Sequence, residues 1–162
     1  NIGNKLEYEQ SLGGTLFVDH ASGLMFNYHQ VSLRSGETLK ARAAFEQMAR
    51  AHDVSVKQYR ADNAPFGCEE FRTAIEDAHQ KISYCGVVAK HQNGVAERGI
   101  QTVTRWARSM LLHSTIHWPE QDVVPLWPFA MDYAVYLWNN LPGRLSGQAP
   151  LEIFSSTSFP SF

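Results

Sequence analysis

The segment that decides the fold of this 162-residue chain is QNGVAERGIQTVTRWARSMLLH, residues 92–113. Apolar side chains recur in it at steps of three and four residues, at Ala96, Ile100, Val103, Ala107, Met110 and Leu111. This spacing predicts a long amphipathic helix from about residue 95 to residue 113. Turn-forming residues precede the helix, and Glu97 stands in its first turns.

The residues before this helix predict a parallel crossover unit. Residues 54–59 alternate as a strand does, residues 69–80 have one apolar helical face, and residues 82–85 form a second short strand pattern. Strand, helix and strand in this order are typical of parallel sheets. Asp62 follows the first strand directly and is therefore expected at the carboxyl edge, where open α/β sheets build their sites.

Asp62 and Glu97 are the candidate catalytic pair. Taken alone, Asp62 is typical of an aspartate that starts a turn, and Glu97 is typical of a first-turn glutamate stabilised by the helix dipole. Together they carry more weight, because the 34 residues between them hold one helix, one strand and a loop. That length allows Glu97 to return to the sheet edge beside Asp62.

Two carboxylates in one cleft, with a third, are the oxygen ligands that suit Mg²⁺ or Mn²⁺. In two-metal phosphodiester chemistry such ions activate the attacking hydroxyl and stabilise the leaving oxygen. The sequence has no GxSxG elbow, Walker A loop or HExxH motif that would indicate other chemistry. Metal-dependent phosphodiester chemistry is therefore the leading hypothesis.

The ends of the chain complete the expected architecture. Residues 15–19 and 24–31 predict two antiparallel strands joined by a hairpin at residues 21–23, followed by a helix over residues 35–52 with Ser35 as its N-cap. Residues 123–140 predict a last helix, apolar on most sides and mostly buried, with Pro125 and Pro128 in its first turns.

Composition limits the classes of protein that fit. A content of 44% hydrophobic and 19% charged residues suits one domain over residues 1–162, with an irregular segment at about 1–12 and an extension at about 143–162. A net charge of -2 argues against a dedicated nucleic-acid binder.

No apolar stretch or signal pattern indicates a membrane partner, so we expect an intracellular protein. Cys68 and Cys85 lack zinc-site spacing and are expected to be buried thiols.

Four separated blocks resemble the integrases of copia-type retrotransposons, within the retroviral integrase superfamily. They are residues 15–23 (TLFVDHASG), residues 59–63 with Phe66 (YRADN), residues 92–98 (QNGVAER) with residues 107–111 (ARSML), and residues 126–130 (LWPFA) through residues 149–154 (APLEIF). The third block is the most specific.

The resemblance implies an α/β fold of the ribonuclease H-like type, a mixed sheet with antiparallel opening strands, a parallel continuation and flanking helices. It also implies a D,D,E triad for DNA strand transfer, in which Asp62 is the second carboxylate and Glu97 the third. Mg²⁺ or Mn²⁺, DNA from the element ends and the target, and a homo-oligomer follow from it. So does a location in the nucleus or a virus-like particle if the element is eukaryotic.

Two departures from the family pattern bear on activity. The family's first catalytic aspartate lies on a strand before residues 15–19, and residues 1–14 contain no aspartate. The chain is therefore expected to be a fragment without the first, central strand, and to lack backbone pairing in the middle of the sheet. Asp19 is a weak replacement that we expect only in the hairpin, and Glu7 and Glu9 are weaker still.

Ala64 stands where the family commonly has glycine after Asp-Asn. Alanine resists the positive-φ turn that glycine supports, at a cost of about 1 kcal/mol. Either the loop takes another turn, or the chain comes from a decayed copy that no longer transposes. Both interpretations stay open from the sequence.

The candidate DNA-binding residues lie on and before the long helix. Glu97, Gln101, Thr104, Arg105 and Arg108 share one stripe, which either follows DNA phosphates or is an ordinary solvated face. Lys90 and His91, in the loop before Glu97, are further candidates. Most of the tryptophans, Trp106, Trp118, Trp127 and Trp138, are expected to pack in the core rather than stack on bases.

Two alternatives to an active integrase core remain. One is a catalytically inactive, integrase-derived module that binds DNA or protein, which Ala64 and the absent first carboxylate favour. The other is a ribonuclease H-type nuclease acting on RNA/DNA hybrids, whose usual four-carboxylate site is not visible in the sequence.

Overall fold

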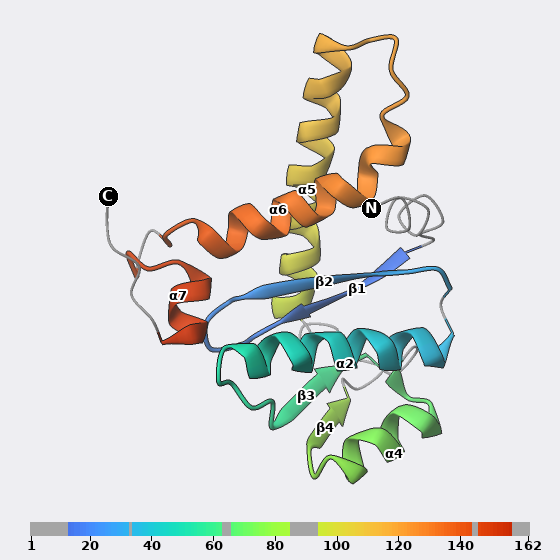
Figure 1. Ribbon diagram of the computed structural model, residues 1–162, viewed down its shortest axis with the longest axis vertical. Coiled ribbons are helices and arrows are strands. Elements are labelled where there is room, and N and C mark those ends of the chain that lie inside the picture. The colour runs from blue at the N-terminus through green and yellow to red at the C-terminus, as the bar shows by residue number, and fades with distance from the viewer. Residues whose placement is uncertain (1–12, 33, 63–65, 85–93, 144–145, 157–162) are drawn as a thin grey trace.

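The computed structural model describes residues 13–32, 34–62, 66–84, 94–143 and 146–156. Its elements in chain order are β1 (Gly13–Val18), β2 (Met25–Gln30), α2 (Ser35–Ala51), β3 (Gln58–Ala61), α4 (Glu69–Asp77), β4 (Lys81–Tyr84), α5 (Gly94–His117), the 3₁₀ helix η2 (Val124–Leu126), α6 (Trp127–Asn140) and α7 (Pro150–Ser155). Figure 1 shows their arrangement.

Strands β1 and β2 form the expected antiparallel hairpin, with Val18 opposite Met25. Asp19 stabilises the turn, because one of its carboxylate oxygens accepts hydrogen bonds from the Ser22 backbone N–H at 2.8 Å and the Ser22 hydroxyl at 2.7 Å. Gly23 has a φ of 75°, a conformation that favours glycine. The turn chemistry of residues 19–23 therefore fixes where the hairpin reverses.

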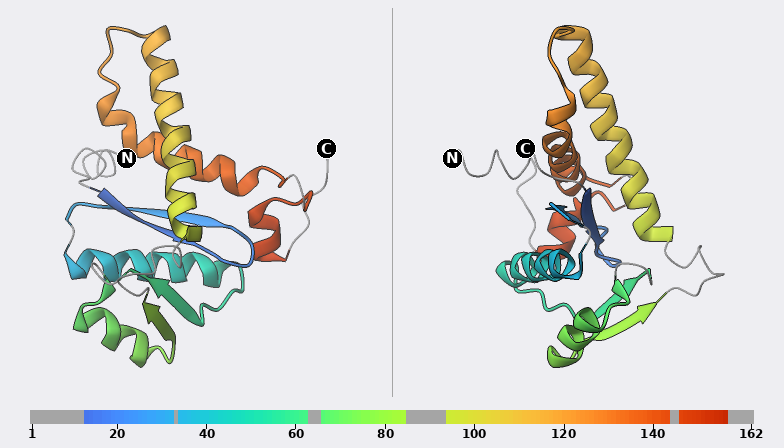
Figure 2. Two further views of the ribbon diagram at one scale, coloured as in Figure 1. Left: turned by 180° about the vertical axis from the view of Figure 1, so that it is seen from behind. Right: turned by 90° about the vertical axis from the view of Figure 1, so that its right-hand side faces the viewer.

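Helices cover both faces of the hairpin (Figures 1 and 2). Successive residues of a strand point to opposite faces. Phe26 and Tyr28 accordingly pack with α2 in one apolar cluster, whereas Met25 packs with α5 and α6 in a second cluster. The order of layers is thus α2, hairpin, then α5 with α6.

Strands β3 and β4 form the expected parallel pair, with Tyr59 opposite Ile82 and α4 in the connection between them. Phe71 and Ile75 of α4 are each 1% exposed and join the α2 cluster. Strand β3 begins at Gln58, later than the predicted residue 54. The late start follows from pairing with β4, because the first bond between the two segments is the one that the Lys81 N–H donates to the Lys57 carbonyl at 2.9 Å.

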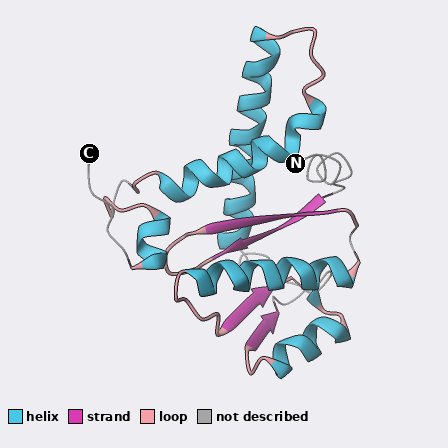
Figure 3. Ribbon diagram, viewed as in Figure 1, coloured by secondary structure: helices cyan, strands magenta, loops and turns pink. Residues whose placement is uncertain are grey.

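The described strands make two separate sheets, β1 with β2 and β3 with β4 (Figure 3). Side chains join them, since the rings of Phe17 and Tyr59 meet edge to face with centroids 6.2 Å apart. This architecture confirms the predicted fold class: antiparallel opening strands, a parallel continuation and flanking helices.

The C-terminal half of the chain departs from expectation in two ways. Helix α5 extends to His117, beyond the predicted end at residue 113, and its last turns project away from the body with the segment that leads to α6 (Figure 1). We predicted that α6 would be mostly buried, and this prediction is wrong. Ala130 and Ala134 face α5, but Phe129, Tyr133 and Tyr136 are about half exposed.

Two smaller findings concern the ends of helices, and two concern whole helices. Ser35 is the first residue of α2 rather than its N-cap, a position that Arg34 takes. Pro125 and Pro128 lie in the first turns of η2 and α6, as expected. Helix α7 was not predicted, and it buries Phe154 against α2. Within the described ranges, no helix is long and apolar enough to cross a membrane.

Candidate functional site

Asp62 is exposed and directly follows the buried Ala61 at the carboxyl end of β3. The position agrees with the sequence argument, because β3 runs parallel to β4 and both strands end at the same edge. The residues that follow, Asn63, Ala64 and Pro65, lie outside the described residues. The chain is described again at Phe66, whose carbonyl accepts a hydrogen bond from the Tyr84 hydroxyl at 2.9 Å.

A buried polar network holds β3 in place. The Tyr59 hydroxyl donates to Glu46 of α2 at 2.8 Å, and the same carboxylate oxygen lies 3.0 Å from Nε of Arg42. The Gln80 amide donates to Glu46 at 2.9 Å and to the Val56 carbonyl at 2.8 Å. The network thereby connects α2 to β3 and to the residue that precedes β4. Its member on β3, Tyr59, lies three residues before Asp62.

The network also changes the ionisation of Tyr59. Burial raises the pKa of its phenol far above the ordinary value, and the hydrogen bond to the Glu46 carboxylate and the charge of that carboxylate raise it further. The Arg42 guanidinium lowers it by a smaller amount. Tyr59 is therefore a neutral hydrogen-bond donor that supports the strand and leaves proton transfer to other groups.

Glu97 is exposed in the first turn of α5. The start of α5 can lie close to the hairpin because Gly99, two residues later, is buried against it. A Cβ at Gly99 would lie 3.1 Å from Cγ2 of Val18 and 3.3 Å from Cε of Met25. Gly99 is a positioning residue that our sequence reasoning missed, although a glycine inside a helical pattern often signals close packing.

The fold brings the elements that carry the two carboxylates together. In both views of Figure 2, the first turn of α5 lies close to the carboxyl end of β3. Two exposed carboxylates fit the oxygen preference of a hard divalent cation. No cluster of three or more His, Cys, Asp or Glu side chains suited to a metal ion occurs among the residues described. Asp62 and Glu97 are exposed on neighbouring elements and stay candidate ligands from the sequence.

The other sequence candidates fall into three groups. Gln101, Arg105 and Arg108 are exposed along α5, on the stripe that begins at Glu97. Lys90, His91, Glu7 and Glu9 lie outside the described residues. Asp19 has the hairpin role that we expected for it, since its carboxylate is bonded to Ser22.

The tryptophans and the cysteines give a mixed result. Trp106 and Trp138 are partly buried and pack against each other with ring centroids 5.9 Å apart. Trp118 and Trp127 are exposed, so core packing accounts for two tryptophans rather than most. Cys68 is a free, half-buried thiol, and Cys85 lies outside the described residues.

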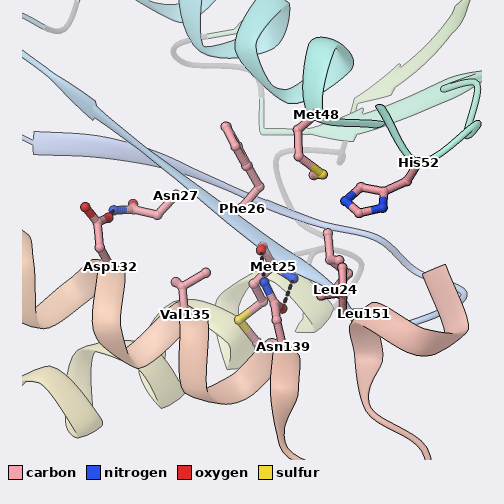
Figure 4. A pocket seen from close by; sticks show the side chains of 10 residues that line it. All are labelled: Leu24, Met25, Phe26, Asn27, Met48, His52, Asp132, Val135, Asn139 and Leu151. Atoms are coloured by element: carbon pink, nitrogen blue, oxygen red, sulfur yellow. Dashed lines mark hydrogen bonds between the residues drawn. The ribbon is translucent and has the colours of Figure 1, made fainter. Parts of the chain in front are cut away.

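A small pocket of about 210 Å³ lies between β2, α6 and the end of α2 (Figure 4). Apolar side chains, the imidazole of His52 and the polar groups of Asn27, Asp132 and Asn139 line it. None of the candidate catalytic or DNA-binding residues does. Its volume is below the range of about 300–1,000 Å³ typical of ligand pockets, so it adds nothing to the site.

Comparison with solved structures identifies the architecture. The magnesium-bound catalytic core of HTLV-2 integrase, in a trimeric form, superposes with a TM-score of 0.63 and 20% identity, over 88% of this chain and 92% of that one. The chain has the fold of retroviral integrase catalytic cores. The BIV integrase core gives a TM-score of 0.63 and 15% identity, over 89% and 91% of the two chains.

In a third solved structure, the shared fold covers only about half of the matched chain. The simian T-cell lymphotropic virus intasome, in complex with PP2A regulatory subunit B56 gamma, gives a TM-score of 0.65 and 17% identity, over 92% of this chain but 54% of that one. No protein-family model and no curated protein sequence matches this chain. Likeness to integrase cores is therefore established for the fold.

Proposed function

We propose that this chain is the catalytic core of a copia-type retrotransposon integrase and performs metal-dependent DNA strand transfer. The observation that carries the proposal is the placement of two exposed carboxylates within an integrase-core fold. Asp62 follows the carboxyl end of β3, and Glu97 stands in the first turn of α5, which lies close to it (Figure 2). These are the positions of the second and third acidic residues in the family that the sequence resembles.

Asp62 and Glu97 would hold Mg²⁺ or Mn²⁺ through their carboxylate oxygens. When bound, such metal ions lower the barrier by activating the attacking hydroxyl and stabilising the charge on the leaving oxygen. The chain's own contribution is rigid placement. The Glu46 network fixes β3 beneath Asp62, and the contact at Gly99 fixes the start of α5 beneath Glu97.

The proposed reaction exchanges one phosphodiester bond for another. The 3′-hydroxyl oxygen of an element end forms a bond to a target phosphorus, and the bond from that phosphorus to the target's 3′ oxygen breaks. The attacking hydroxyl loses its proton and the leaving oxygen gains one, so atoms and charge balance. Energy from nucleotide hydrolysis is not required, which agrees with a sequence that has no Walker A loop.

The first aspartate of the triad is proposed to lie on an upstream strand between β1 and β3. The two described sheets support this placement, since no ladder joins β1 to β3 and only side chains such as Phe17 and Tyr59 link them. A strand added there would pair with both sheets and make them continuous. Its carboxylate would reach the same edge as Asp62.

The partners proposed for this core are DNA and further copies of the chain. Gln101, Arg105 and Arg108 form an exposed stripe that starts beside Glu97 and suits contact with phosphates. Lys90 and His91, which precede Glu97 in the sequence, would extend it. Integrase cores with this fold have been solved in trimeric and dimeric forms, and one in an intasome, which supports both kinds of partner.

The outer face of α6 is the surface we propose for contact between copies. Phe129, Tyr133 and Tyr136 recur at steps of four and three residues and are 46%, 54% and 60% exposed. The rings of Tyr133 and Tyr136 stack with centroids 6.1 Å apart. Exposed aromatic residues gathered on one face are typical of protein interfaces.

The interface prediction is tested by replacing both tyrosines with serine. We expect the wild-type chain to elute as an oligomer and the Tyr133→Ser, Tyr136→Ser variant as a monomer in size-exclusion chromatography with light scattering. The control variant Thr73→Ser changes an exposed residue of α4 and should leave the mass of the oligomer unchanged. A wild-type chain that stays a monomer at every concentration tested would refute the proposed interface.

Strand transfer is tested with the chain extended upstream, in the presence of Mg²⁺ or Mn²⁺. Asp62→Asn and Glu97→Gln should each lower the rate by roughly a hundredfold or more, because losing even an outer-shell partner costs a metal site 10- to 100-fold. The exposed Asp77 and Glu120 supply the matched controls Asp77→Asn and Glu120→Gln, which should retain activity.

Two results would count against an active enzyme. If Asp62→Asn and Glu97→Gln retain full activity, these carboxylates are not the ligands. If the folded, extended protein is inactive with either metal but still binds DNA, the inactive integrase-derived module is the better description. Ala64→Gly is then the next variant to assay, because it restores the glycine common in the family.

A further inference from the structure

The last two turns of α5 carry a pair of histidines outside the candidate catalytic site. His113 and His117 are four residues apart and exposed, so they lie one above the other on the helix surface. Their Nε2 atoms are 3.4 Å apart and their ring centroids 4.5 Å apart. Both imidazoles therefore present a nitrogen to the same point in solvent.

We propose that His113 and His117 form a binding site for a divalent transition-metal ion such as Cu²⁺, Ni²⁺ or Zn²⁺. Imidazole nitrogen is a preferred ligand of these ions. Two nitrogens bound at 2.0–2.1 Å in tetrahedral geometry lie about 3.3 Å apart, close to the separation found here. The Nε2–Nε2 distance of 3.4 Å is long for a hydrogen bond, so a metal ion that binds between the two imidazoles displaces only a weak interaction.

The backbone holds the pair in this arrangement. His117 is the last residue of α5, and the Trp118 N–H still donates to the Ser114 carbonyl at 2.8 Å, which closes the turn that carries His117. The Thr115 hydroxyl donates to the Leu111 carbonyl at 2.8 Å within the same turns. A helix that is already formed imposes the spacing of the two imidazoles before an ion arrives.

The electrostatic surroundings favour a cation. The C-terminal end of a helix carries partial negative charge. Residues 109–143 contain no lysine or arginine, whereas Glu120 and Asp122 follow the helix closely in sequence. Because the described residues near the pair supply no third His, Cys, Asp or Glu ligand, water would fill the other coordination positions. The site is thus an open, two-ligand site at the projecting end of α5 (Figure 1).

The expected metal preference separates this pair from the carboxylates. Affinity should follow the order Cu²⁺ above Ni²⁺ above Co²⁺, with Mg²⁺ too hard to compete for two imidazoles. Trp118 supplies a nearby reporter, because its ring centroid is 5.9 Å from that of His117. Bound Cu²⁺ or Ni²⁺ should therefore quench its fluorescence.

The test is a titration of the 162-residue chain with CuCl₂ and with NiCl₂, in a non-chelating buffer with excess MgCl₂, followed by calorimetry and tryptophan fluorescence. We expect one high-affinity ion per chain. His113→Asn and His117→Asn should each weaken binding by roughly tenfold or more, because removal of an outer-shell partner alone costs 10- to 100-fold. Both positions are exposed, and far-UV circular dichroism checks that the helix is retained.

Two further variants make the result decisive. His79→Asn removes an exposed histidine whose φ of 53° asparagine readily adopts, and it should leave binding unchanged. Adding Leu112→His and Ile116→His to the chain that lacks both native histidines rebuilds the four-residue spacing on an exposed face and should restore binding. The proposal is overturned if the wild-type chain binds neither ion, or if His113→Asn and His117→Asn bind as tightly as the wild type.

Discussion

At the scale of single residues, Tyr59 links the stability of the fold to pH. In the unfolded chain its phenol would ionise near the ordinary pKa of 10.0, whereas burial and the Glu46 carboxylate raise the pKa in the folded state. Above about pH 10 the unfolded state therefore releases a proton that the folded state keeps. Rising pH then favours unfolding, and the stability that Tyr59 contributes is fully present only below pH 10.

We predict that Tyr59→Phe reduces this decline in stability above pH 10. Below that pH the variant should be less stable than the wild type by roughly 1.5–3 kcal/mol, since it loses a hydrogen bond to a charged group. The difference should shrink as the pH rises from 9 to 11. Urea unfolding at a series of pH values measures it, and parallel curves for the two proteins would contradict the assignment.

Single residues also show how far a sequence can predict a site. Asp62 and Glu97 were predicted by local signals, a strand end and the start of a periodic helix, and the structure places both at those points. The residues that support them depend on distant partners. Gln80 reaches Glu46 from 34 positions away, and Gly99 matters because of Val18 and Met25. No local pattern records such pairings.

At the scale of elements, α6 protects the outer edge of β2. The Met25 N–H donates to the side-chain oxygen of Asn139 at 2.8 Å, and the Asn139 amide donates to the Met25 carbonyl at 2.7 Å. One side chain thus satisfies both backbone groups as a neighbouring strand would. Asp132 of α6 contacts two side chains of β2. Its carboxylate accepts a hydrogen bond from the Asn27 amide at 2.9 Å and lies 2.8 Å from Nε2 of His29.

We predict that Asn139→Ala destabilises the chain by about 1–3 kcal/mol, because two partly buried backbone groups lose their partner. Hydrogen exchange at the Met25 amide should accelerate more than exchange elsewhere in β2. Asn140→Ala is the matched control, since Asn140 is exposed and its side-chain amide donates within α6, to the Tyr136 carbonyl at 2.8 Å. Equal effects of the two substitutions would show that the edge contact contributes little.

Element boundaries were predicted less well than element types, for identifiable reasons. Residues 54–57 alternate as a strand does, but the Val54 N–H donates to the Ala49 carbonyl at 2.9 Å and still belongs to the end of α2. Helix α5 continues to His117, just before the Trp118-Pro119 step, because a residue before proline avoids the helical region. That signal was available in the sequence, whereas the alternation of residues 54–57 gave no sign that local backbone bonds at the end of α2 would hold Val54.

At the scale of the whole molecule, the distribution of charge matters more than its sum. A net charge of -2 argues against a dedicated nucleic-acid binder, but the net charge does not tell where the charged side chains lie. The exposed face of α5 carries Arg105 and Arg108 on one stripe with Glu97, so any phosphate contact would be local to the site. A weakly acidic chain is compatible with DNA contact when its cations are gathered on one helix face.

We predict that the double variant Arg105→Ala, Arg108→Ala weakens DNA binding about equally for all sequences, because phosphate contacts carry no base information. Each lost contact releases one counterion fewer, so the slope of log K against log salt should become shallower by about two units. Arg50→Ala is the control, because Arg50 is also an exposed arginine but lies on a different helix, α2. Fluorescence anisotropy over 50–200 mM salt measures the slopes. If Arg50→Ala changes the slope as much as the double variant does, the contact is a diffuse attraction to the whole surface, and α5 is not the DNA-binding face.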